Sequence, residues 1–243
     1  MLRVADLWGP AGDPFLAAIS LEVPYGATHA VIGPIHSGKS LLLRHIVGLE
    51  RPERGAVIVA GDRFDATAPD DVLARMRRRI GVVFEGSALI SRLTALENVE
   101  LPLLEHAHAA ERSAREVARA LLAEVGLRGD VDTVPAMLFR ADQRRVALAR
   151  ALALRPALLL VDEPGHRLDA HAASQLDETI ERLQAAHGFG VLLCSHEARY
   201  AFGRAETTSV MVGGRIVAQG GRDELDPASH EVVRQLVDRR GAA

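Results

Sequence analysis

Residues 33–40 read Gly33-Pro34-Ile35-His36-Ser37-Gly38-Lys39-Ser40, and the fold can be inferred by working outward from them. Glycine, four variable residues, glycine, lysine and then serine or threonine is the pattern of a phosphate-binding loop. The chain has 29 lysines and arginines together, and Lys39 is the only lysine. A compact ammonium on a flexible stem can reach between β- and γ-phosphates as a point charge, which a planar guanidinium cannot do in the same loop. A single lysine at this position therefore favours a nucleotide-binding role over its presence by chance in an arginine-rich chain.

The residues on either side give this loop the context that it requires. Residues 28–32 are a short apolar run that predicts a strand, and residues 41–47 have a helical apolar pattern closed by Gly48. In this order, backbone N–H groups and the helix N-terminus converge on phosphate oxygens. We therefore predict that the loop binds phosphates and that the hydroxyl of Ser40 binds Mg²⁺.

Composition limits the class of protein. The 243 residues are 48% hydrophobic, which suits one sizeable domain or a core with an inserted subdomain. A net charge of −3 gives no electrostatic case for binding nucleic acid. The single cysteine, Cys194, lies in an apolar run and indicates a reducing compartment. No apolar run approaches the roughly 18 residues of a membrane span, and the N-terminus lacks a signal-peptide pattern. We expect a cytoplasmic chain whose work at a membrane would need separate membrane subunits.

Strand and helix patterns alternate on both sides of a helical middle region. Before it we predict strands at 28–32, 56–59 and 80–84 and a helix at 70–79. Within 86–154 we predict helices at 111–125 and 141–154, and a capping box between Thr94 and Glu97. After it we predict a strand at 157–161, a helix at 170–187, a strand at 190–194 and a hairpin of 208–212 with 215–218. This alternation predicts an α/β fold with a mostly parallel sheet.

Two further groups of polar residues follow apolar runs. Asp162 and Glu163 end the run at 158–161, about 120 residues after the phosphate loop. The first carboxylate can hold Mg²⁺ through water, and the second can polarise an attacking water. Solvated acids are common at strand ends, so this prediction depends on the phosphate loop. His196, just past the strand at 190–194, can hydrogen-bond a γ-phosphate at the same edge of a parallel sheet.

The order of these motifs resembles the ATP-binding cassette (ABC) ATPases over nearly the whole chain. Further shared features are the run Ala-Leu-Ala-Arg-Ala-Leu at 147–152 and Leu168-Asp169. The resemblance implies a P-loop NTPase of the RecA-like type, with a mostly parallel sheet core, an N-terminal antiparallel β subdomain and an inserted helical subdomain. It also implies that Trp8 stacks on adenine and that Asp169 touches a partner subunit.

The resemblance implies a domain plan and a set of site residues. We expect a single ABC ATPase domain at 1–225, with its core at about 1–85 and 156–225, its helical subdomain at about 86–155, and a C-terminal helical tail at 226–243. Residues expected to contact ATP are Trp8, Gly33, Pro34, Ile35, His36, Ser37, Gly38, Lys39, Ser40, Leu41, Glu85 and Asp162. Residues expected to hold Mg²⁺ are Ser40, Glu85 and Asp162. Residues expected to act in hydrolysis are Lys39, Glu163 and His196.

A narrower resemblance concerns short segments that look like the Mla/Mce branch, whose transporters move phospholipids or other lipids. The segments are 84–89, 97–103, 105–106, 214–220 and 231–236. Many cassette ATPases share parts of them. They imply a lipid or phospholipid as the transported molecule.

The chain departs from the family at the signature, which in the family reads Leu-Ser-Gly-Gly-Gln and closes over the γ-phosphate bound to the other subunit. The aligned residues are Leu138-Phe139-Arg140-Ala141-Asp142. Phe139 removes a hydroxyl, Arg140 and Ala141 remove the conformational freedom of glycine, and Asp142 brings a negative charge near a phosphate. The loss of a phosphate-binding element can slow phosphoryl transfer by about 10²- to 10³-fold.

Two other departures concern the half-site formed by the loop and the acid pair. His36 stands where the family usually has glycine, which strains the loop if that position has a positive φ. Glu85 stands where a glutamine usually binds Mg²⁺, so it keeps an oxygen ligand but adds charge beside Asp162 and Glu163.

These observations predict an ATP-binding and ATP-hydrolysing subunit of an ABC transporter that energises lipid transport. Its partners would be transmembrane permease subunits and a second cassette, in a homodimer or a heterodimer with another ABC ATPase, on the inner face of the cell membrane. The alternative is a nucleotide-binding regulatory or weakly hydrolysing subunit that pairs with a second, intact ATPase. A soluble cassette acting on DNA or ribosomes usually has tandem cassettes or a long coiled-coil insertion, and this chain has neither pattern.

Overall fold

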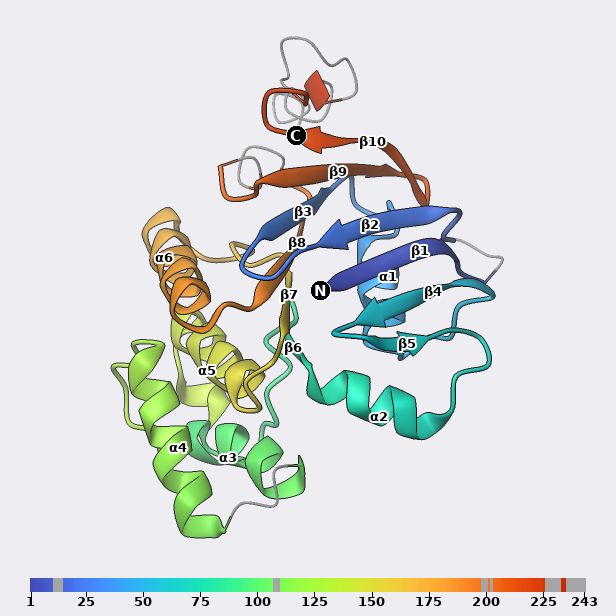
Figure 1. Ribbon diagram of the computed structural model, residues 1–243. Helices are drawn as coiled ribbons and strands as arrows, with labels where there is room; N and C mark the ends of the chain where they lie inside the picture. Colours follow the sequence, from blue (N-terminus) through green and yellow to red (C-terminus); the bar gives the residue numbers. More distant parts are fainter. Residues whose placement is uncertain (11–14, 107–109, 198–200, 202, 226–232, 235–243) are drawn as a thin grey trace. The chain divides into compact units, whose positions relative to one another are not determined.

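The computed structural model describes residues 1–10, 15–106, 110–197, 201, 203–225 and 233–234 (Figure 1). The chain divides into two compact units, and each is described separately. The first unit comprises residues 1–77 and 190–243, and the second comprises residues 78–189. Most of the C-terminal tail predicted at 226–243, and with it most of the segment at 231–236, lies outside the described residues. None of the described helices is both long enough and apolar enough to cross a membrane.

The first unit contains an antiparallel sheet with the strand order β2-β1-β4-β5 (Figure 1). Its strands are β1 (Leu2–Trp8), β2 (Ile19–Val23), β4 (Arg54–Val59) and β5 (Asp62–Phe64). In β2 buried and exposed side chains alternate strictly, which is the pattern of a sheet with one face in the core. This sheet is the N-terminal antiparallel subdomain that the resemblance implies.

The first unit also holds the strands that carry the phosphate loop. They are β3 (Thr28–Ile32), β8 (Gly190–Ser195), β9 (Thr207–Val212) and β10 (Arg215–Gly221). β3 lies between β8 and β9 and is parallel to both, whereas β10 is antiparallel to β9. Every residue of β3 and β8 is buried, as expected for strands covered on both faces. The helix α1 (Lys39–Ile46) follows the loop and contacts β8. The predicted strand, loop and helix order is therefore confirmed.

The second unit contains two parallel strands and most of the helices (Figure 1). The strands are β6 (Ile80–Val83) and β7 (Leu158–Asp162). The helices are α3 (Ala95–His106), α4 (Glu111–Glu124), α5 (Arg140–Leu152) and α6 (Ala170–His187), with a short 3₁₀ turn at Pro135–Met137. α3 packs against α4 and α5. The helix α2 (Asp70–Arg78) ends at the boundary between the two units.

The capping box of α3 and the bounds of α6 match the sequence prediction. The capping box at α3 forms, because Thr94 N donates to Glu97 Oε2 at 2.8 Å and Glu97 N donates to Thr94 Oγ1 at 3.1 Å. α6 has the predicted bounds, since the Asp169 side chain accepts from Ala172 N at 2.8 Å and Gly188 ends the helix with φ 74°. Asp169, expected to touch a partner subunit, thus caps its own helix in this chain.

A buried histidine lies in the middle of the first unit. His29 in β3 is fully buried, and its two ring nitrogens lie 2.7 Å from Thr207 Oγ1 and 2.8 Å from Ser209 Oγ, both on β9. Burial lowers the pKa of His29 from 6.5 to about 4, because the charged imidazolium loses its hydration. His29 is therefore neutral at physiological pH.

This histidine predicts a loss of stability in acid. Between pH 6.5 and pH 4 the unfolded chain takes up a proton at His29 and the folded chain does not. The free energy of unfolding is therefore expected to decrease by about 3 kcal/mol as the pH falls through this window. Urea unfolding of the wild type and of His29→Gln at each pH checks this, because glutamine keeps the hydrogen bonds and cannot titrate. Equal pH slopes for the two proteins would contradict the prediction.

Candidate nucleotide-binding site

The phosphate loop starts at the carboxyl end of β3, where the backbone is closely enclosed. Gly33 N donates to Ser195 O at 3.3 Å. A Cβ atom at Gly33 would lie 2.0 Å from Met211 O, so no other residue fits here without moving β9. The first glycine of the motif is thus required for close packing of the backbone rather than for a special φ angle.

Two residues of the loop have left-handed backbone angles. Gly38 has φ 103° and precedes α1, where Leu42 N donates to Gly38 O at 2.9 Å. His36 has φ 66°, so the condition for strain at this position is met. A non-glycine residue in this region costs about 1 kcal/mol or more. Alternation of this kind turns successive N–H groups to one side, which is the backbone arrangement of an anion-binding loop.

Lys39 lies inside the loop and is only 7% exposed. Its Nζ donates to Gly33 O at 2.8 Å, to Pro34 O at 3.0 Å and to Ser37 Oγ at 3.4 Å. Three oxygen acceptors therefore hold the ammonium over the same backbone whose N–H groups would bind phosphate. Ser40, the expected Mg²⁺ ligand, is exposed in the first turn of α1.

A glycine outside the motif fixes the loop from the other side. Gly214, in the turn between β9 and β10, donates from its N–H to Ser37 O at 2.9 Å and accepts from Ala17 N at 2.9 Å. A Cβ at Gly214 would lie 2.0 Å from Phe15 O, and its φ is 72°. The sequence predicted a hairpin turn here, but nothing in a turn pattern could reveal that the turn supports the phosphate loop.

Trp8 and His196 also belong to the first unit. Trp8 is half-buried at the end of β1, its Nε1 donates to Asp6 Oδ1 at 2.9 Å, and the guanidinium carbons of Arg54 and Arg215 lie 5.9 and 6.0 Å from its ring centroid. An adenine that stacks on this ring would have to replace whichever guanidinium covers that face. His196 directly follows β8, where Ser195 pairs with Ile32, so it lies beside the start of the phosphate loop.

The three predicted acids belong to the second unit. β6 and β7 are parallel with Val83 opposite Val161, so Glu85, Asp162 and Glu163 lie at or just after neighbouring strand ends. Asp162 is buried and Glu163 is half-buried with φ 48°. Glu85 Oε1 lies 3.2 Å from His166 Nε2.

Two arginines on α5 hold the residues after β6, and no sequence motif predicts this contact. Arg144 is 3% exposed and donates to Phe84 O and, at 3.5 Å, to Glu163 O. Arg150 donates to Ala88 O at 2.8 Å and to Ser87 O at 3.1 Å, and burial lowers its pKa. These bonds stabilise the backbone at Ser87, Ala88 and Glu163, where φ is positive. They thereby fix the backbone position from which the Glu163 side chain extends.

Residues 138–142, which the resemblance aligns with the family signature, lead into α5 at Arg140. Phe139 is the N-cap residue, makes no side-chain capping bond and is 84% exposed. Arg140 is exposed and lines a polar pocket of about 250 Å³ together with Glu85 and His166. Asp142 pairs with Arg145 at 2.8 Å. Its own helix therefore supplies a counter-charge to Asp142.

Comparison with known proteins agrees with this fold and loop. A family model described as "ABC transporter" matches residues 16–166, more than half of the chain. The chain belongs to the ABC transporter family and is an ATP-binding subunit of that class.

Individual relatives cover most of the chain. It is 40% identical to the lipoprotein-releasing system ATP-binding protein LolD of Anaeromyxobacter dehalogenans, over 87% of this chain and 88% of the relative. It is 37% identical to the L-cystine transport system ATP-binding protein TcyN of Escherichia coli, over 94% and 93%. The solved structure of the ATP-binding cassette MJ0796, a dimer in a post-hydrolysis state with ADP and Pi, is 29% identical with a TM-score of 0.81 over 91% of this chain and 99% of that one.

Membership of this family means that the chain binds ATP with Mg²⁺ and hydrolyses it. The residues present fit ATP, since the loop has left-handed turns, a helix N-terminus and an enclosed ammonium. Within the described ranges no group of three or more His, Cys, Asp or Glu side chains could by itself hold a metal ion. Mg²⁺ in a nucleotide site needs no such group, because phosphates and water supply most of its ligands.

Proposed function

We propose that this chain is the ATP-hydrolysing subunit of an ABC transporter that moves a lipid or a lipid-modified molecule. The observation that carries the ATPase part is the enclosed Lys39 in a loop with the left-handed turns of His36 and Gly38. The lipid part is supported by the similarity to LolD, whose name concerns lipoproteins, and by the short Mla/Mce-like segments. The similarity to TcyN, named for L-cystine transport, is the competing observation.

In the proposed reaction each site residue has one task. The loop N–H groups and Lys39 bind the β- and γ-phosphates, and Trp8 stacks on the adenine. Ser40, Glu85 and Asp162 would hold Mg²⁺, which neutralises phosphate charge when bound. Glu163 orients the attacking water and accepts its proton, and His196 donates a hydrogen bond to the γ-phosphate.

The proposed assembly contains two cassettes and membrane partners. Two copies, or one copy and another ABC ATPase, would close head to tail so that residues 138–142 of one cover the nucleotide of the other. Transmembrane permease subunits would hold the pair at the inner face of the cell membrane and convert closure into transport. The relative MJ0796 was solved as a dimer, which supports this pairing. The relatives named above do not favour the alternative of a weakly hydrolysing regulatory subunit.

Purification of the intact complex from membranes tests this proposal. We expect permease subunits and lipid to co-purify with the chain, and phosphate release from ATP to increase when lipid or lipoprotein is restored to the delipidated complex. The same complex carrying Lys39→Ala is the control for contaminating ATPases. Stimulation by cystine or another amino acid, with no effect of lipid, would overturn the lipid assignment and leave the ATPase assignment standing.

A further inference from the structure

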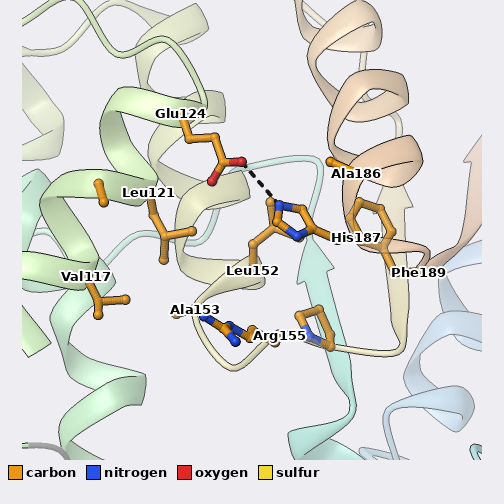
Figure 2. Close-up of a pocket in the computed structure, with 11 residues that line it drawn as sticks. Val117, Leu121, Glu124, Leu152, Ala153, Arg155, Ala186, His187 and Phe189 are labelled. Atoms are coloured by element: carbon orange, nitrogen blue, oxygen red, sulfur yellow. Dashed lines mark hydrogen bonds and ion pairs between the residues drawn. The ribbon is translucent and has the colours of Figure 1, made fainter.

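A second pocket lies in the second unit, and none of the residues that line it is assigned to ATP. It is formed by the last part of α4, the end of α5 and the end of α6 (Figure 2). Its volume is about 600 Å³, which is within the range of pockets that bind small organic molecules. All of its lining residues belong to one compact unit, so the pocket does not depend on the placement of the other.

Most of the wall of this pocket is apolar. Val117 and Leu121 come from α4, Leu152 from the last turn of α5, and Phe189 from the residues after α6 (Figure 2). Val117 is 42% exposed although it is a large aliphatic side chain. An apolar ligand body that covers this wall would remove it from water, which is the dominant favourable term in most binding.

The charged groups around the pocket differ in whether they have partners. Glu124 Oε1 lies 3.2 Å from His187 Nε2, and this pair spans one side of the pocket (Figure 2). The backbone oxygen of Glu124 also accepts from Arg182 at 2.6 Å. Arg155 lines the pocket, and its guanidinium makes no hydrogen bond or ion pair with any residue that the structure describes. The charge left available to a ligand is therefore positive.

The backbone at Arg155 shows that the turn alone does not call for arginine. Arg155 has φ 50°, and its N–H donates to Leu152 O at 2.9 Å in the turn that ends α5. Glycine adopts this conformation without the steric penalty of a side chain. The side chain is thus held over an apolar pocket by a strained residue, and strain of this kind often accompanies a binding role.

We propose that this pocket binds an amphipathic anion, a carboxylate or phosphate carried on an acyl or alkyl chain. The anionic head would pair with Arg155, and the chain would lie against Val117, Leu121 and Leu152. Glu124 contributes an opposing charge, and its Oε1 lies 3.2 Å from His187 Nε2. The proposal is independent of ATP hydrolysis, because binding takes place on residues that the reaction does not use.

Calorimetric titration of the purified full chain without nucleotide tests this proposal. Decanoate and decyl phosphate are expected to bind with dissociation constants of about 1 mM or below, the range set by their size. Two kinds of control probe should bind at least about tenfold more weakly than decanoate and decyl phosphate. Acetate and inorganic phosphate have the charge without the alkyl chain, and decyltrimethylammonium has the chain with the opposite charge. The tighter binder of decanoate and decyl phosphate shows whether the pocket prefers a carboxylate or a phosphate head group.

Variants with opposite expected effects make the test specific. Arg155→Gln should weaken decanoate binding at least about tenfold, and Glu124→Gln should strengthen it, because it removes an opposing charge. Arg128→Gln is the matched control, since Arg128 is exposed after α4 and does not line the pocket. Arg155→Gly should abolish binding without lowering the thermal midpoint. Three results would overturn the proposal. They are equal decanoate affinity of the wild type and Arg155→Gln, equal binding of the cationic and anionic probes, and no binding of either anion up to its solubility limit.

Discussion

Replacing Glu163 by glutamine is expected to slow phosphate release from ATP by about 10²- to 10⁴-fold, the contribution typical of a positioned general base. Glutamine has the same shape but cannot accept the proton of the attacking water. ATP binding should persist, because the phosphate loop and Lys39 are unchanged. Single-turnover phosphate release measured on the assembled complex, together with an ATP-binding titration, checks both parts.

The control for this variant is Glu178→Gln, the same chemical change at an exposed position on α6. It should leave the rate unchanged. If Glu163→Gln and the wild type hydrolyse ATP at the same rate, Glu163 is not the base, and the task must belong to another group such as Glu85 or His196.

Replacing Lys39 by alanine is expected to weaken ATP binding at least about 10²-fold, because two charge-assisted bonds to phosphate oxygens are lost. Lys39→Arg should also weaken ATP binding. The ammonium occupies an enclosed position with three oxygen acceptors, and a planar guanidinium cannot make the same contacts there. Titration of each purified variant with a fluorescent ATP analogue measures the change.

Arg44→Ala is the matched control, because Arg44 is an exposed cation on the same helix that pairs with Glu50 at 2.8 Å. Its affinity for ATP should equal that of the wild type. A thermal midpoint for Lys39→Ala separates lost binding from lost folding. Unchanged affinity in a folded Lys39→Ala protein would remove the basis of the nucleotide site.

The parts of the fold that depend on local sequence were predicted well. The strand at 28–32 and the helix at 170–187 have the predicted bounds, because apolar runs, an N-cap aspartate and a C-terminal glycine are local signals. The capping box of Thr94 and Glu97 forms as expected for the same reason. Element bounds elsewhere shifted by a residue or more, as with α5, which starts at Arg140 and ends at Leu152.

The parts of the candidate site that depend on distant residues could not be predicted. The bond from Gly214 to Ser37 joins residues far apart in the chain, and so does the contact of Arg144 with Phe84. The sequence showed these residues only as a hairpin turn and as one arginine in a basic helix. The pairing of Asp142 with Arg145 is local, but helix periodicity alone does not say whether an acid turns to a neighbour or to a ligand. The roles assigned to Glu163, His196 and the Mg²⁺ ligands stay predictions.

The solitary lysine has a practical consequence for chemical labelling. Apart from the terminal amine, an acylating reagent finds one primary amine in the whole chain, and that amine sits within the oxygen cage of residues 33–37. The extent of acylation at Lys39 therefore measures the fraction of molecules in which its amine is accessible to the reagent. No lysine elsewhere competes for the label or for a regulatory acyl group, so a mass shift on the peptide that contains Lys39 reports on a single atom.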